Sequence, residues 1–189
     1  MKESRTGEPQ QSTFRSWVTE DQIYIDYHDH EWGTETKGQQ QLFEGISLEG
    51  FQAGLSWLTI LKRRDGFRSA FEGFQPEQVA RFDEQKLAEL ANDEGIIRNR
   101  AKIASVVNNA KVVVEQGLDL TELMWSFAPA VSRTDTKNFE WRAVSAESQA
   151  LSKELKRLGF SFVGPTTMYA LMQSSGMIFD HAPNCFRSN

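Results

Sequence analysis

Apolar residues recur at spacings of mostly three and four along most of this 189-residue chain, and no segment alternates convincingly between apolar and polar residues. Such spacing gathers apolar side chains on one face of a helix, whereas a half-buried strand requires strict alternation. The pattern is clearest in the segments 40–64, 95–117, 147–159 and 165–176. The last three end at a glycine, which is typical of a helix C-cap. The sequence therefore predicts an all-α fold built from many short helices.

The bulk properties are those of an ordinary globular protein. Hydrophobic residues make up 39% of the chain and charged residues 25%, and the length suffices for one domain or two small lobes with a sizeable core. No apolar run approaches the roughly 18 residues of a membrane span, and the polar residues 1–13 lack the apolar centre of a signal peptide. We therefore expect a disordered tail over 1–13, a single helical domain over 14–189 and no membrane partner.

Charge and cysteine content narrow the setting further. Cys185 is the only cysteine, so no internal disulfide can form, and this fits a reducing cytoplasm. The formal net charge of −5 argues mildly against a nucleic-acid partner, because phosphate-binding proteins are usually basic. A local basic patch can nevertheless outweigh the global sum. We expect a cytoplasmic protein and leave the nucleic-acid question open at this point.

Two neighbouring segments combine aromatic and polar residues in an unusual way. In "DQIYIDYHDHEWG", Tyr24 shares a helical face with both Tyr27 and His28. In "SLEGFQAGLSW" (47–57), a carboxylate at Glu49, two glycines and Trp57 stand where a buried helix is expected, although glycine weakens a helix and an unpaired buried carboxylate is costly. The aromatic residues are either ordinary core or the walls of a pocket for a flat ring, which Glu49 and Trp57 would complete.

The segment of about 150–176 reads as a helix, a short hairpin bounded by glycines and a second helix. Its Val163-Gly164 turn leads directly into a helix N-terminus, where free backbone N–H groups and the helix dipole favour an anion. Lys156 and its basic neighbours on the preceding helix could add positive charge. The segment is either an ordinary pair of antiparallel helices or a helix-hairpin-helix element that grips a DNA phosphate.

A third pattern involves metal-binding residue types. His181 and Cys185 have an H-x3-C spacing, and His28 lies far away in the sequence. Imidazole and thiolate both suit Zn²⁺, but a structural zinc site usually has four protein ligands. The spacing alone is weak evidence for a metal.

The blocks "WVTEDQIYIDYHDHEWG", "LFEGISLEGFQAGLSWLTILKRR", "GIIRNRAKI", "WSF" and "LSKELKRLGFSFVGPTTMYALMQSSGMIFDH", with the closing cysteine, occur in this order. Together they resemble the bacterial 3-methyladenine DNA glycosylase I family, a divergent branch of the helix-hairpin-helix glycosylases. The resemblance runs from Trp17 to Cys185. It implies two helical lobes with a base pocket between them. It also implies release of free 3-methyladenine from alkylated double-stranded DNA by hydrolysis of the N-glycosidic bond.

The resemblance also assigns roles to individual residues. The carboxylate of Glu49 would be the catalytic group that faces the extruded base. The pocket would be formed by Tyr24, Tyr27, Trp57, Gln52 and Phe51. Phe51 stands where relatives often have glutamine, so it either tightens an aromatic pocket or faces the core. Residues that would contact DNA are Gly54, Leu55, Gly159, Val163, Gly164, Thr166 and Lys156.

The resemblance further implies a monofunctional enzyme that acts as a monomer. No lysine occupies the hairpin position used by the strand-cleaving members of the superfamily, so we expect no strand cleavage and no catalytic cofactor. Asp180 lies near the catalytic aspartate of many relatives, but "DH" belongs to this branch's own pattern, and we expect a structural role for it. The alternatives are a glycosylase for another alkylpurine and a non-catalytic reader of DNA or nucleobases.

The chain departs from the family at a metal site that joins the two chain ends. His28, His181 and Cys185 match three of its four zinc ligands, but Arg15 replaces the first cysteine. Arginine cannot serve as that ligand. Either three protein ligands hold a structural Zn²⁺ with an open fourth position, or the ends are joined without metal, with Arg15 pairing to a carboxylate or to the C-terminal segment.

Overall fold

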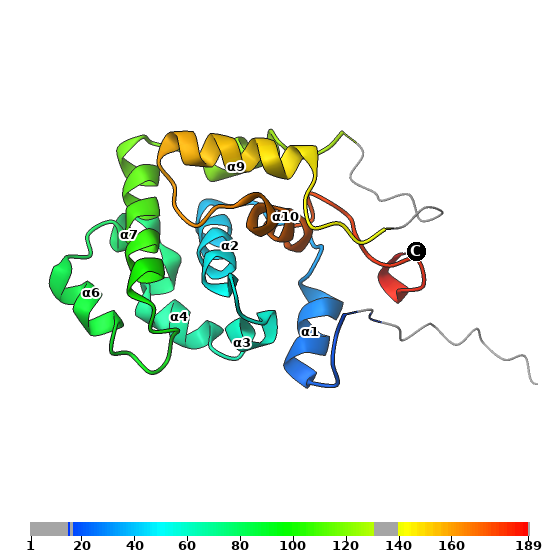
Figure 1. The fold of residues 1–189 in the computed structure, drawn as a ribbon, viewed down its shortest axis with the longest axis horizontal. Helices are drawn as coiled ribbons and strands as arrows, with labels where there is room; N and C mark the ends of the chain where they lie inside the picture. The colour runs from blue at the N-terminus through cyan, green and yellow to red at the C-terminus, as the bar shows by residue number, and fades with distance from the viewer. Residues whose placement is uncertain (1–14, 16, 131–139, 189) are drawn as a thin grey trace, which may run out of the picture.

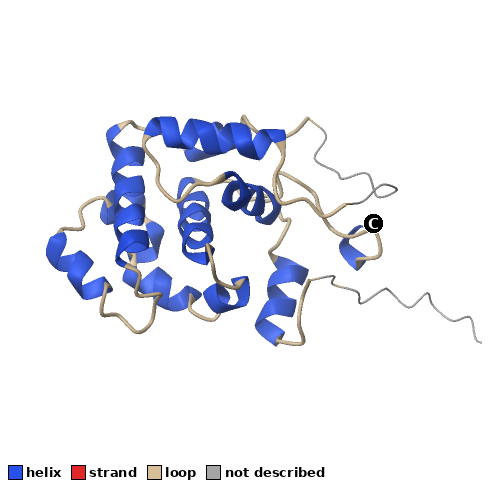
Figure 2. Cartoon of the chain, in the orientation of Figure 1, coloured by secondary structure: helices blue, strands red, loops and turns tan. Residues whose placement is uncertain are grey.

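The computed structural model describes residues 15, 17–130 and 140–188, and its regular secondary structure is helical (Figures 1 and 2). The predicted all-α fold is confirmed for this part of the chain, which contains no β-strand. The helices are α1 (Gln22–His30), α2 (Gln39–Gln52), α3 (Trp57–Leu61), α4 (Arg64–Ala70), η1 (Glu72–Phe74), α5 (Pro76–Val79), α6 (Glu84–Leu90), α7 (Arg100–Glu115), α8 (Leu120–Trp125), α9 (Ala146–Leu158), α10 (Pro165–Ser174) and η3 (Phe186–Ser188). The predicted tail lies outside the described residues, and the domain boundaries stay predictions.

Helix α2 occupies the centre of the molecule and packs against α3, α7, α8, α10 and η1 (Figure 1). Its eight buried residues cover more than one face and include the carboxylate. They are Leu42, Phe43, Ile46, Ser47, Leu48, Glu49, Gly50 and Phe51. A helix surrounded in this way fixes the positions of its side chains closely, because protein interiors are packed at crystal-like density.

The stretch 47–57 is not one continuous helix. Helix α2 ends at Gln52, and Gly54 adopts a φ of 82°, which a side chain would resist. Ser56 then caps α3, with its hydroxyl accepting a hydrogen bond from the backbone N–H of Thr59 at 3.2 Å. The second glycine of "SLEGFQAGLSW" therefore ends one helix and permits the turn into the next.

Helices α9 and α10 are joined by residues 159–164, which we call the hairpin. A reciprocal capping box between Ser145 and Ser148 begins α9, and Gly159 ends it in the left-handed conformation, with a φ of 106°. Pro165 occupies the first turn of α10, where a missing N–H costs nothing. This arrangement agrees with the helix, hairpin and helix expected over about 150–176, whereas the division into two lobes stays a prediction.

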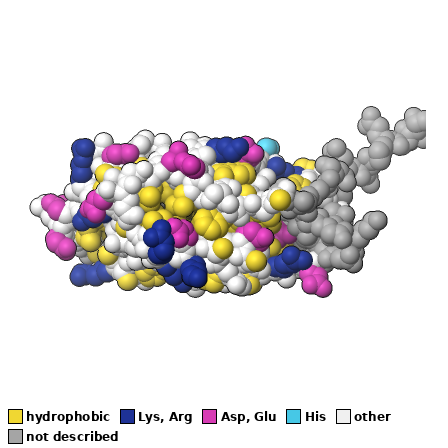
Figure 3. Space-filling model, turned by 90° about the horizontal axis from the view of Figure 1, so that it is seen from above, with side chains coloured by type: hydrophobic (Ala, Val, Ile, Leu, Met, Phe, Trp, Pro, Cys, Tyr) yellow, Lys and Arg dark blue, Asp and Glu magenta, His cyan; other side chains and the backbone are white. Residues whose placement is uncertain are grey.

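No helix within the described ranges is both long enough and apolar enough to cross a membrane. On the face that carries α9, Lys and Arg side chains are interspersed with Asp and Glu around a central group of apolar side chains (Figure 3). The negative net charge is thus not concentrated on this face.

Candidate functional site

Helices α1, α2 and α3 bring five of the predicted catalytic and substrate-binding residues together. Tyr24 and Tyr27 come from α1, Glu49 and Gln52 from the last turn of α2, and Trp57 from the first position of α3. Helix α1 packs on α3, and α3 on α2. The aromatic rings of Tyr27 and Trp57 lie 5.5 Å apart, centroid to centroid, at an interplanar angle of 48°. Two residue sets that are about 25 positions apart in the sequence therefore share one site.

Glu49 is the most unusual group in this site. Its side chain is only 4% exposed, and its Oε2 atom has no hydrogen-bond partner among the described residues. Burial away from water raises the pKa of this carboxyl to about 8. The carboxyl is therefore mostly protonated at neutral pH until a cation approaches it. Because buried polar groups nearly always have partners, an orphan of this kind marks a place where a ligand could form a hydrogen bond.

A second orphan lies beside the first. The indole Nε1 of Trp57 is also buried and has no hydrogen-bond partner in the described part of the chain. Burial, and next the nearby Glu49, raise the pKa of Tyr27 well above its ordinary value, so its hydroxyl keeps its proton. The site thus offers one unpaired carboxyl oxygen, one unpaired N–H donor and two aromatic faces to whatever binds there.

Two cavities meet at the residues Tyr27, Glu49 and Trp57. The first, which we call the aromatic cavity, has a volume of about 280 Å³. Its walls are Trp17, Tyr24, Tyr27, Trp32, Glu49, Gln52, Trp57, Trp141, Arg142, Ala170 and Gln173. Five of the six predicted catalytic and substrate-binding residues are in this set. The aromatic residues of α1 were expected either to pack in the core or to line a pocket. Tyr27 is buried in the core and also lines the aromatic cavity.

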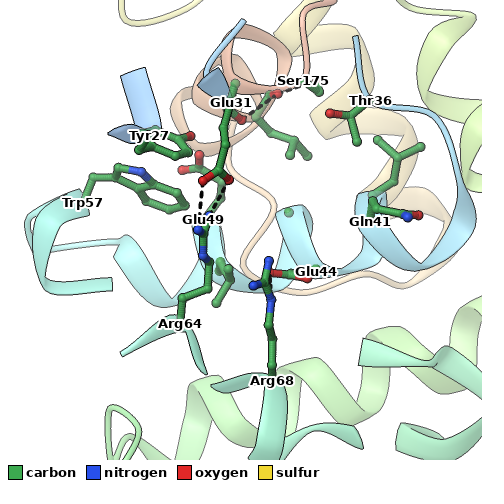
Figure 4. Close-up of a pocket in the computed structure, with 15 residues that line it drawn as sticks. Tyr27, Glu31, Thr36, Gln41, Glu44, Glu49, Trp57, Arg64, Arg68 and Ser175 are labelled. Carbon is green, nitrogen blue, oxygen red and sulfur yellow. Dashed lines mark hydrogen bonds and ion pairs between the residues drawn. The ribbon is translucent and has the colours of Figure 1, made fainter. Parts of the chain in front are cut away.

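The second cavity, which we call the ion-pair cavity, was not predicted. It has a volume of about 190 Å³, and Glu49 lines it together with Arg64 and Arg68 (Figure 4). Arg64 donates two hydrogen bonds to the carboxylate of Glu31 beside it, and Arg68 pairs with Glu44 at 2.8 Å. These partners are 33 and 24 residues apart, so no local sequence pattern could have revealed them.

The structure corrects the prediction that Phe51 lines the pocket. Phe51 is fully buried and contributes to neither cavity; its ring packs 4.6 Å from that of Phe67 and 6.0 Å from that of Phe71. Glu49 and Phe51 are two positions apart on α2, so their side chains diverge by roughly 200° around the helix axis. The alternative that Phe51 faces the core is the correct one.

The loop after α2 projects the predicted DNA-contacting residues Gly54 and Leu55. Leu55 is 39% exposed, and space around Gly54 is open. Sequence reasoning missed the residue that holds this loop. Lys102 of α7 is buried, and its Nζ donates hydrogen bonds to the backbone carbonyls of Phe51, at 2.9 Å, and Ala53, at 2.6 Å. A cation there is well placed, because the helix dipole is negative at the C-terminus of α2.

The remaining predicted DNA contacts, in and around the hairpin, differ in how exposed they are. Lys156, Gly159 and Thr166 are exposed, and Gly164 is half-buried at the N-cap of α10. The side chain of Val163 is in the core, so only its backbone can reach a ligand. Gly50 of α2 lies against the hairpin: a Cβ there would be 3.4 Å from the Cβ of Phe162.

Comparison with known proteins places this geometry in a family. The methyladenine glycosylase family matches residues 17–188. The chain belongs to this family. It is 42% identical over 175 residues to DNA-3-methyladenine glycosylase 1 of Escherichia coli (strain K12), covering 89% of this chain and 93% of that protein. It is 44% identical over 176 residues to DNA-3-methyladenine glycosylase of Haemophilus influenzae, covering 89% and 94%.

Solved structures agree with the sequence relatives. A crystal structure of 3-methyladenine DNA glycosylase I superposes with a TM-score of 0.85 at 39% identity, covering 90% of this chain and 97% of that one. A structure of 3-methyladenine DNA glycosylase I from Staphylococcus aureus, which describes the basis of its 3-methyladenine recognition, also superposes with a TM-score of 0.85. The two chains are 32% identical, and the match covers 93% of this chain and 96% of that one. The predicted family membership is therefore confirmed.

For a member of the methyladenine glycosylase family, the cluster at the chain ends is of special interest. His28, His181 and Cys185 are all buried, and their ligand atoms lie within 4.8 Å of one another. The Sγ atom of Cys185 is 3.6 Å from Nε2 of His28 and 3.5 Å from Nδ1 of His181. A tetrahedral zinc ion would separate an imidazole nitrogen and a thiolate sulfur by about 3.6 Å, so these three donors fit Zn²⁺.

Arg15 does not join this cluster as a donor. It forms a two-bonded ion pair with Asp29, at 2.7 and 2.6 Å, which is the carboxylate pairing considered among the alternatives for this residue. Asp29 in turn lies 2.9 Å from Nδ1 of His28, and carboxylates often orient metal-binding histidines in this way. Arg187 donates hydrogen bonds to backbone carbonyls of α1 and the turn after it. Protein contacts alone therefore already join the two chain ends.

Asp180 is buried, and its carboxylate contacts two side chains of α10. Its Oδ2 atom accepts hydrogen bonds from the Tyr169 hydroxyl and the Gln173 amide, both at 2.7 Å. Gln173 lines the aromatic cavity. The expected structural role agrees with these contacts, whose donors are residues of α10.

Proposed function

We propose that this protein is a DNA glycosylase that hydrolyses the N-glycosidic bond of 3-methyladenine in alkylated double-stranded DNA. The observation that carries the proposal is the unpaired, buried carboxyl of Glu49 beside the rings of Tyr27 and Trp57. The relatives named above as 3-methyladenine glycosylases support the same substrate.

The proposed substrate matches the site chemically. 3-Methyladenine in DNA carries a positive charge on its ring, and aromatic faces attract a desolvated cation by roughly 2 kcal/mol. An ionised Glu49 would accept hydrogen bonds from the N–H donors of the base and offset that charge. Neutral adenine cannot favour ionisation of Glu49 in this way, so the costly burial of the carboxyl becomes a means of selection.

The reaction follows from this recognition. The enzyme bends the duplex and flips the damaged nucleotide into the aromatic cavity, which costs least for a damaged base. The methylated base is already a good leaving group, so the site need not protonate it strongly. Glu49 stabilises positive charge as the bond to the sugar breaks, and water then attacks C1′. No catalytic cofactor is involved, and the sugar-phosphate strand stays intact.

The DNA is held by the two loops described above. Leu55 fills the space left by the flipped base, while the hairpin and α10 grip a phosphate through backbone N–H groups, with Lys156 nearby. One monomer wraps one lesion. Because the net charge is −5, non-specific affinity is expected to be weak and to fall steeply with added salt.

We further propose that the cluster of His28, His181 and Cys185 binds a structural Zn²⁺ with three protein ligands and no part in the chemistry. The donor spacing given above supports this proposal. Metal analysis of the purified protein tests it: one zinc per chain, lost in Cys185→Ala, is expected. Absence of zinc in carefully purified, folded protein would leave the hydrogen bonds from Arg187 to the backbone of α1 and the turn after it as the link between the ends.

The function itself is tested by treating N-methylated duplex DNA with the protein and identifying released bases by chromatography. Wild type is expected to release 3-methyladenine, and Trp57→Ala to be clearly impaired. Release of a different alkylpurine would keep the reaction class and change the substrate. No release by folded wild-type protein would contradict the proposal and favour a non-catalytic reader.

A further inference from the structure

Phe162, at the tip of the hairpin, combines an exposed side chain with a strained backbone. Its φ is 58°, and its side chain is 40% exposed. Only three residues other than glycine have a positive φ in the described part of the chain, and Phe74, the other phenylalanine among them, is fully buried in the core. A non-glycine residue in this conformation is destabilising, and core packing does not explain Phe162 as it explains Phe74.

The structure around Phe162 forces this conformation upon it. Asn109 of α7 holds the preceding residue, Ser161, through two hydrogen bonds: its Oδ1 accepts from the backbone N–H at 2.8 Å and its Nδ2 donates to the carbonyl at 3.1 Å. Ser152 of α9 holds the following residue, Val163, by donating to its carbonyl at 2.6 Å. Both holding side chains are buried. Glycine would adopt the same backbone conformation without this cost, so the backbone alone does not explain a phenylalanine at this position.

The position of the ring indicates what it contacts. Phe162 lies against Gly50, one turn of α2 beyond Ile46 and just before the loop that carries Gly54 and Leu55. Leu55 and Phe162 are thus two exposed apolar side chains at the same end of α2. Proteins that distort DNA often use apolar side chains of this kind as wedges against bases and sugars.

We propose that Phe162 is a second apolar DNA contact, which packs against the base or sugar next to the flipped nucleotide while Leu55 fills the gap. This inference rests on the proposed function. The contact is apolar, so it contributes affinity that depends little on salt, in contrast to Lys156, whose contribution comes from releasing counterions from phosphate. Phe162 does not touch the aromatic cavity, so it leaves recognition of the free base unchanged.

The test compares Phe162→Gly with wild type in binding to a duplex that carries a tetrahydrofuran abasic-site analogue. Affinity is expected to fall roughly 10-fold, with an unchanged slope of log K against log salt. Lys156→Gln should instead reduce the slope by about 0.9. Phe162→Leu, which keeps an apolar side chain, should retain part of the affinity. Val114→Ala, at an exposed apolar residue of α7, should bind like wild type.

Two further measurements separate this inference from a folding defect and from the proposed function. Phe162→Gly should melt within roughly 3 °C of wild type, and its tryptophan fluorescence should respond to free 3-methyladenine as wild type does. The inference would be overturned if Phe162→Gly bound the duplex as tightly as wild type does. It would also be overturned if the variant lost free-base binding as strongly as duplex binding. If wild type itself released no base, the proposed function would fail instead.

Discussion

Two aromatic clusters lie on different sides of α2, and they are built for different purposes. The phenylalanine cluster of Phe51, Phe67, Phe71 and Phe74 is fully buried, and its neighbouring rings lie 4.6–6.4 Å apart. The tryptophan-tyrosine cluster of Trp17, Tyr24, Tyr27, Trp32 and Trp57 lines a cavity and surrounds an unpaired carboxyl. One side of the helix is closed, and the other is open.

The difference teaches which aromatic residues serve stability and which serve binding. Phenylalanine contributes only apolar area, so a closed cluster has no polar atom to satisfy. Tyrosine and tryptophan add a polar group that needs a partner, and at Trp57 that partner is missing. Glu49 and Phe51, two positions apart, show that one helix can serve both purposes when its sides face different surroundings.

The largest effect should come from the closed cluster. Phe51→Ala removes a fully buried ring and leaves a void, so it should lower the free energy of unfolding by about 3–5 kcal/mol. Urea unfolding measures this change. Protein that is still folded should bind free 3-methyladenine normally. Trp57→Ala, on the open side, should show the reverse pattern: a smaller loss of stability and a severe loss of binding. If both variants lost stability and free-base binding to the same extent, the distinction between the two clusters would not hold.

Glu49→Gln should separate activity from stability. It removes the negative charge that the cationic base needs, so single-turnover excision should fall roughly 100-fold. The folded-state pKa of about 8 lies above the unfolded value, so the folded protein binds more protons between about pH 4.5 and 8 and wild-type stability falls as pH rises through that window. The variant escapes this loss and should be more stable at pH 7 by about 1–3 kcal/mol.

Glu115→Gln, at an exposed position of α7, is the matched control for this variant, because it removes a carboxylate that water already solvates. Its melting temperature and excision rate should stay at the wild-type values. A Glu49→Gln protein that is less stable than wild type at pH 7 would contradict the view that the carboxyl is buried at a cost.

Lys102→Met should weaken the loop that carries Leu55. Two backbone carbonyls at the end of α2 lose their donor, which should cost about 1–3 kcal/mol of unfolding free energy. Affinity for lesion-bearing duplex should fall with it, while free-base binding changes little, because Lys102 does not line the aromatic cavity. Thermal melting and duplex titration together check this. A variant with normal duplex affinity would show that the loop needs no such anchor.

The smallest effect is expected at the ion-pair cavity. Arg64→Gln breaks its pair with the partly exposed Glu31, so the stability loss should be less than about 1 kcal/mol, and excision should stay close to wild type. Chromatographic assay of released base checks the activity. A collapse of excision would mean that the base occupies the ion-pair cavity rather than the aromatic one, and the comparison of the two sides would have to be redrawn.

Much of this architecture is predictable from the sequence. The spacing of apolar residues predicts helices, and Gly159 marks the end of α9 because its left-handed conformation suits glycine. The set of Tyr24, Tyr27, Glu49, Gln52 and Trp57 could be anticipated because the resemblance to a known family supplied their roles.

The remaining features depend on partners that are distant in the sequence. Lys102 looks like any helix-surface lysine until α7 is placed against the end of α2, 49 residues earlier in the chain. Phe51 shares the helical periodicity of its neighbours, and only packing on Phe67 shows that it faces the core. The positive φ of Phe162 follows from its neighbours' hydrogen bonds to α7 and α9, which no local pattern encodes.

The central claim is that the buried carboxyl of Glu49 must ionise to receive a cationic base. The most direct test is the pH dependence of single-turnover excision at enzyme concentrations below saturation, where the free enzyme's pKa governs the rate. The account predicts that the wild-type rate rises about 10-fold per pH unit and levels near pH 8, while Glu49→Gln gives a low and flat profile. A wild-type profile that is flat from pH 6 to 9 would contradict it.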